Sequence, residues 1–134
     1  MKRQLDAVLL LLRDLCFRYQ IRPENVVGHS DIAPGRKPDP GPLFPWKWLY
    51  SNGVGAWYDD PVPSCCMEDH SRTMEKLREY GYKHEDNDPR VEAIVRAFQM
   101  HFMPQDVTGK ITNQMNGVLY LLCQKYIQNN DNKL

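Results

Sequence analysis

The chain of 134 residues is 42% hydrophobic and 25% charged, which is the composition of an ordinary globular protein. Its formal net charge is zero and its basic residues are scattered, so the charge pattern does not favour nucleic acid as a partner. The longest apolar run, residues 7–12, is far shorter than the roughly 20 residues of a transmembrane helix. It also lacks the length and cleavage site of a signal peptide, so we expect a core helix and no targeting signal.

Residues 3–20 carry the pattern of an amphipathic helix. Apolar residues recur at the spacing of one helical face, namely Leu5, Val8, Leu9, Leu12, Leu15, Cys16 and Tyr19. Pro23 interrupts the helix, and Val26–Gly28 then reads as a short buried strand. A helix, a turn, a strand and a functional loop in this order predict an α/β fold, with the site beyond the carboxyl end of the strand.

The loop of residues 28–41, the site loop, contains the residues best suited to chemistry. Three prolines stiffen it, and it carries His29 and Asp39 ten positions apart. An imidazole and a carboxylate are both zinc ligands, and a catalytic zinc takes three protein ligands and keeps a position for water. Lys37 lies two residues before Asp39, so in an extended segment both side chains point to one side, where the ammonium can stabilise an oxyanion.

The residue types alone leave a simpler interpretation open. His29 can be a hydrogen-bonded histidine at the end of a strand, and Asp39 can open a Pro-Gly turn, because short motifs have many false positives. Asp31 is expected to hydrogen-bond the turn rather than bind metal. His70, His84 and His101 lack metal-ligand spacing, so we expect them to be solvated or to cap helices.

The full string favours the chemical interpretation. The segment HSDIAPGRK (residues 29–37), followed by DPGP (39–42) and FPW (44–46), resembles the zinc-dependent N-acetylmuramoyl-L-alanine amidases of the AmiD and AmpD type, which are related to peptidoglycan-recognition proteins. The resemblance implies that His29 and Asp39 bind Zn²⁺ and that Lys37 assists the transition state. It implies hydrolysis of the amide between N-acetylmuramic acid and L-alanine by zinc-activated water, with peptidoglycan or muropeptide fragments as partners. It also implies a place in the cell envelope (periplasm or outer membrane) or outside the cell.

One feature departs from that family. Its further zinc-binding His and catalytic Glu lie well upstream of the motif, whereas residues 1–28 contain no His. We therefore expect residues 1–58 to be the C-terminal half of a mixed-sheet amidase domain, with weak or no activity by itself. Two alternatives stay open: a peptidoglycan-binding remnant without catalysis, and a truncated product whose half sheet exposes an unpaired strand edge.

The rest of the chain predicts short helices. A helix is expected near Pro45, with Phe44, Trp46 and Leu49 packed beneath the site loop, although one of these aromatics can instead contact a glycan. Residues 59–68 read as a linker. None of the four cysteines has C-x-x-C spacing, and Cys16 and Cys123 lie on apolar helix faces as small hydrophobes.

Residues 69–129 predict a three-helix module, followed by a frayed tail at 130–134. The first helix ends at Gly81, the second is capped by Asp88 with Pro89 as its first residue, and the third runs from Thr112 to about Ile127. The order Tyr80-Gly81-Tyr82, Ala97-Phe98-Gln99 and His101-Phe102 resembles a peptidoglycan-binding module, which in AmiD-type amidases follows the catalytic domain. The alternative is a helical appendage that only covers the amidase core. Nothing in the sequence indicates the oligomeric state.

Overall fold

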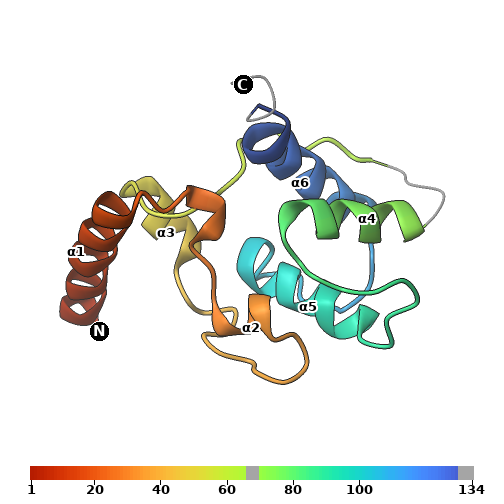
Figure 1. The fold of residues 1–134 in the computed structure, drawn as a ribbon, viewed down its shortest axis with the longest axis horizontal. Coiled ribbons are helices and arrows are strands. Elements are labelled where there is room, and N and C mark those ends of the chain that lie inside the picture. Colours follow the sequence, from red (N-terminus) through yellow and green to blue (C-terminus); the bar gives the residue numbers. More distant parts are fainter. Residues whose placement is uncertain (66–69, 130–134) are drawn as a thin grey trace.

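The computed structural model describes residues 1–65 and 70–129, and every regular element within these ranges is helical (Figure 1). The elements in order are α1 (Lys2–Tyr19), the 3₁₀ turn η1 (Pro23–Asn25), α2 (His29–Ile32), α3 (Trp46–Ser51), α4 (His70–Tyr80), α5 (Val91–Phe102), α6 (Asn113–Cys123) and the π-helical turn η2 (Gln124–Gln128). The predicted α/β fold with a mixed sheet is therefore wrong for the described chain. The start of the predicted three-helix module at residue 69 and the tail at 130–134 lie outside the described residues.

The predicted strand at Val26–Gly28 is extended backbone without a sheet. Val26 has φ −87° and ψ 99°, and Gly28 has φ −89° and ψ 167°, so both lie in the β region. Val26 N–H donates to Pro23 C=O (3.2 Å) and not to a neighbouring strand. Apolar composition predicted the backbone conformation correctly, but a strand also needs a partner, and no described segment provides one.

Helix α1 forms where it was predicted and lies at one end of the molecule (Figure 1). Its inward face is only partly covered, with Leu9 buried, whereas Leu10, Phe17 and Tyr19 are strongly exposed. Arg13 ties the helix to the end of α3 by donating two hydrogen bonds to the Asn52 carbonyl (3.0 and 2.7 Å). No helix in the described ranges is long and apolar enough to cross a membrane.

The three predicted helices of the C-terminal part are confirmed as α4, α5 and α6, and α4 packs against α6. Gly81, at φ 135°, follows α4, and Thr112 Oγ1 accepts a hydrogen bond from Met115 N–H (3.1 Å) at the start of α6. The α-helical part of α6 ends at Cys123, and the π-helical turn η2 continues to Gln128. The local capping signals thus predicted these ends well.

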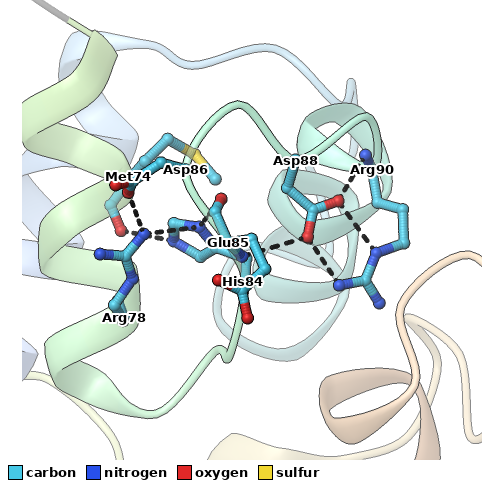
Figure 2. A network of polar contacts seen from close by, with 7 residues as sticks. All are labelled: Met74, Arg78, His84, Glu85, Asp86, Asp88 and Arg90. Carbon is cyan, nitrogen blue, oxygen red and sulfur yellow. Dashed lines mark hydrogen bonds and ion pairs between the residues drawn. The ribbon is translucent and has the colours of Figure 1, made fainter.

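Helix α5 begins two residues later than predicted, with Arg90 as its N-cap. The Asp88 carboxylate accepts hydrogen bonds from Arg90 N–H (2.8 Å), Nε (3.0 Å) and Nη2 (2.7 Å), as Figure 2 shows. On the other side of this network, Arg78 pairs with Asp86, and His84 Nε2 lies 2.8 Å from the Met74 carbonyl of α4. Asp88 therefore orders the loop before the helix, although its carboxylate does not accept from an N–H of the helix itself.

A single cluster of buried hydrophobic residues joins the two predicted parts of the chain. Its members from the first part are Leu9, Trp46, Leu49, Val54, Ala56 and Trp57, and the second part contributes Leu77, Tyr80, Tyr82, Phe98, Phe102, Leu119 and Leu122, among others. Residues on both sides of residues 59–68 thus bury their apolar surface against one another. The predicted boundary at 59–68 lies between segments that share a core.

Candidate functional site

The site loop closes on itself and brings its two predicted metal ligands together. Ser30 N–H, in the first turn of α2, donates to the Asp39 carbonyl (2.8 Å), so the two ends of the loop are held side by side. His29 Nδ1 then lies 3.2 Å from Asp39 Oδ2. Both side chains are open to solvent, with 41% of His29 and 61% of Asp39 exposed.

This pair has the donor chemistry of a zinc site, since imidazole nitrogen and carboxylate oxygen are both common ligands of that ion. Their closeness and exposure allow one ion to reach both atoms from solvent. Among residues 1–65 and 70–129, however, no group of three His, Cys, Asp or Glu side chains gathers closely enough to hold a metal. The described residues therefore fit two of the three protein ligands that a catalytic zinc requires.

Lys37 lies in the same loop, and its side chain is exposed. Its backbone N–H donates to the Ala33 carbonyl (3.0 Å), which fixes the turn after α2. No ion pair joins its ammonium to Asp39 within the described residues. No hydrogen bond joins it to His29 either, so within the described residues the Lys37 side chain is not engaged with the two predicted ligands.

Asp31, two residues after His29 in α2, is buried, with 5% of its side chain exposed. Its Oδ2 accepts from Gly28 N–H (2.8 Å), which confirms the predicted bond to the turn. Its carboxylate also accepts from the Tyr82 hydroxyl at Oδ1 (2.6 Å) and from His101 Nδ1 at Oδ2 (2.8 Å). Three donors satisfy this buried charge, as a buried carboxylate requires.

Burial, followed by the nearby charge of Asp31, raises the pKa of the Tyr82 hydroxyl well above its usual range. The phenol therefore keeps its proton at neutral pH and acts as the donor in this contact.

The prediction that His101 is solvated or caps a helix is wrong. Only 4% of its side chain is exposed, and its ring stacks on that of Trp46 with centroids 3.9 Å apart and planes at 12°. Its partner Asp31 lies 70 residues earlier in the chain, on α2. Sequence spacing did not reveal the contact, because only the packing of α5 against α2 brings the two residues together.

Gly28 is required at the start of α2 by close packing. A Cβ at this position would lie 2.6 Å from Pro40 Cδ and 3.3 Å from Trp46 Cζ2. The backbone of the site loop therefore sits directly on the first residue of α3.

The aromatic residues after the loop confirm the packing interpretation in part. Trp46 and Leu49 are buried and Phe44 is half-buried. Phe44, Trp46 and Tyr58 also line an open groove of about 490 Å³ between α3 and the end of α5. Contact with a glycan stays a prediction.

Comparison with known proteins agrees with the motif. Residues 1–42 match the model of the N-acetylmuramoyl-L-alanine amidase family. The chain is 40% identical over 135 residues to the N-acetylmuramoyl-L-alanine amidase AmiD of Escherichia coli (strain K12), an alignment that covers 93% of this chain and 49% of AmiD.

Solved structures give the same result. A complex of E. coli AmiD with the substrate anhydro-N-acetylmuramic acid-L-Ala-D-γ-Glu-L-Lys has a TM-score of 0.85 at 38% identity, over 93% of this chain and 52% of that one. AmpDH3 from Pseudomonas aeruginosa in complex with anhydromuramic pentapeptide has a TM-score of 0.82 at 38% identity, over 94% and 54%. The chain thus spans about half the length of these proteins.

Proposed function

Because this chain is a homologue of the AmiD/AmpD-type amidases along nearly its whole length, we propose that it carries the zinc-binding half of an N-acetylmuramoyl-L-alanine amidase site. The observation that carries the proposal is the pairing of His29 Nδ1 and Asp39 Oδ2 at 3.2 Å on a solvent-exposed loop. His29 and Asp39 are ten residues apart in the sequence, and the hydrogen bond from Ser30 N–H to the Asp39 carbonyl keeps them side by side.

His29 and Asp39 would hold the ion, which when bound activates a water and polarises the scissile carbonyl. Lys37 would stabilise the negative charge that develops on the carbonyl oxygen, a contribution of roughly 3 to 4 kcal/mol for a well-aimed donor. A third ligand and a general base would have to come from elsewhere, because no group of three His, Cys, Asp or Glu side chains among residues 1–65 and 70–129 could hold a metal ion. The isolated chain should accordingly be weakly active or inactive.

The substrate class that we propose is a muramyl peptide of peptidoglycan, cleaved at the amide between N-acetylmuramic acid and L-alanine. Both structural relatives were solved with anhydro-muramyl peptides, which supports this class. For such a substrate we propose a location in the cell envelope or outside the cell. The part of the chain from residue 69 to 129 would add contacts to peptidoglycan.

The test is the zinc content of the purified 134-residue chain beside His29→Ala and Asp39→Ala. We expect weak binding that either substitution abolishes, and little release of stem peptides from purified peptidoglycan. Zinc binding that survives both substitutions would contradict the proposed ligands. Chelator-sensitive release at an ordinary enzymatic rate by the isolated chain would contradict the proposal that a third ligand and a base come from elsewhere. Peptidoglycan binding without any zinc binding would favour a non-catalytic wall-binding protein.

A further inference from the structure

The buried Asp31 connects the site loop to the C-terminal helices. Its carboxylate accepts from Gly28 N–H (2.8 Å), the residue just before His29. In the same short helix, Ser30 N–H donates to the Asp39 carbonyl (2.8 Å). Whatever fixes Asp31 therefore fixes the backbone on which both proposed ligands are carried.

The two other donors to Asp31 come from distant parts of the chain. Tyr82 follows α4 and lies 51 residues away, and His101 lies on α5 and 70 residues away. Both residues are buried, and their bonds to the carboxylate are short, at 2.6 and 2.8 Å. We call Asp31, Tyr82 and His101 the Asp31 cluster.

Packing leaves this cluster little freedom to move. The His101 ring stacks on Trp46, and Trp46 in turn lies 3.3 Å from the place where Gly28 would carry a Cβ. Tyr82 packs edge-on against Phe98 of α5, with ring centroids 5.8 Å apart. Tyr82 and His101 are therefore fixed by packing against the core that the two parts of the chain share.

We propose that Tyr82 and His101 are positioning residues for the zinc ligands His29 and Asp39, acting through Asp31. This inference rests on the proposed function. The two ligands are exposed and form only part of a coordination shell. Their affinity for an ion therefore depends on how well the surrounding residues fix the orientation of the two side chains. The C-terminal part of the chain then does more than cover the amidase part, because it supplies two of the three donors to Asp31.

The chain offers a matched pair of variants. Tyr82→Phe removes the hydroxyl that donates to Asp31, whereas Tyr80→Phe removes a buried hydroxyl that has no hydrogen-bond partner among the described residues. His101→Asn keeps a donor near the position of Nδ1, and His101→Leu removes it. Each variant is titrated with ZnCl₂ below its own unfolding transition, and the Kd is read from the NMR resonances of the His29 ring.

We expect Tyr82→Phe and His101→Leu to weaken zinc binding about tenfold, the lower end of the usual effect of residues that orient metal ligands. Tyr80→Phe should stay within about twofold of the unaltered chain, and His101→Asn should recover most of the loss. A purely structural role would lower thermal stability and leave the Kd unchanged, and that result would overturn the inference while the zinc site stands. No zinc-dependent shift of the His29 resonances in the unaltered chain would overturn both.

Discussion

At the scale of single residues, the site loop combines a stiff backbone with exposed donors. His29 and Asp39 face solvent, whereas Asp31 of the same loop is buried and accepts from three donors. The exposed pair is available for binding, and the buried acid holds the loop in place. Lys37 lies in the same loop but makes no ion pair within the described residues.

Lys37 is predicted to act on the reaction and not on the metal. In Lys37→Met, zinc affinity should stay within about twofold of the unaltered chain. Where the unaltered protein has measurable amidase activity, the variant should lose about 10²- to 10³-fold in kcat, the usual cost of removing one oxyanion donor. The NMR zinc titration and peptide release measure the two effects separately. A large fall in zinc affinity would instead make Lys37 part of the binding site.

Asp88 gives a prediction on pH. The side-chain hydrogen bond from Arg90, and then the one from its backbone N–H, lower the pKa of Asp88 well below its usual range. A carboxyl whose folded pKa is lowered stabilises the fold at pH values above its unfolded pKa of about 3.9, and this stabilisation disappears as pH falls through the folded pKa. Asp88→Asn should therefore be less stable than the unaltered chain at pH 7, with a smaller difference at pH 3.

Urea unfolding at the two pH values measures this effect, with Asp86→Asn as the control. Asp86 pairs with Arg78 at an 89% exposed position, where ion pairs contribute little, so its effect at pH 7 should be the smaller one. An equal loss for Asp88→Asn at both pH values would mean that charge is not the cause.

At the scale of elements, helix α6 illustrates how closely irregular backbone can pack on a helix. A Cβ on Gly117 would overlap the Pro63 carbonyl of the segment that crosses α6. In this segment Cys65 N–H also donates to the Asn113 carbonyl (3.3 Å). Residues 63–65 are thus fixed against the helix.

Gly117→Ala should destabilise the protein, although alanine normally favours a helix over glycine. We expect a loss of about 1 to 3 kcal/mol or more in the free energy of unfolding, the usual cost of overpacking a core. Chemical denaturation measures it, and Tyr120→Ala, at a 43% exposed position of the same helix, should change stability much less. A stabilised Gly117→Ala would mean that Pro63 moves aside freely.

The sequence predicted the helices well because their signals are local. Thr112 as N-cap, Gly81 after α4 and the apolar stripe of α5 all act within one or two turns. The strand at Val26–Gly28 was wrong because a sheet depends on a partner that no local pattern specifies. His29 and Asp39 could be predicted as one site because they lie in a single loop. The buried contact of His101 could not be predicted, because its partner Asp31 is 70 residues away.

At the scale of the whole molecule, one core extends across the predicted linker. Trp46 and Trp57 from the first part and Phe102 and Leu122 from the second belong to the same buried cluster. The Trp57 backbone N–H also donates to the Tyr126 hydroxyl (3.1 Å) near the end of the described chain. Neither part can expose its core without uncovering that of the other.

The chain should therefore unfold in a single transition. Tryptophan fluorescence reports on residues 46–57, and thiol labelling of Cys123 reports on α6, where burial raises the pKa of the thiol to about 12. Both probes should give one midpoint in urea, as expected for a two-state unit. Two separate midpoints would instead support a boundary at 59–68 with independently stable domains.

The 70 residues between Asp31 and His101 also set an order of events during protein synthesis. At 5 to 20 residues per second, the ribosome releases the site loop roughly 4 to 14 s before the helix that carries His101. Throughout that interval the loop lacks one donor to its buried acid, so a nascent chain halted before α5 would carry His29 and Asp39 without their final arrangement. The proposed metal site would thus mature only once α5 has been made and has packed against α2.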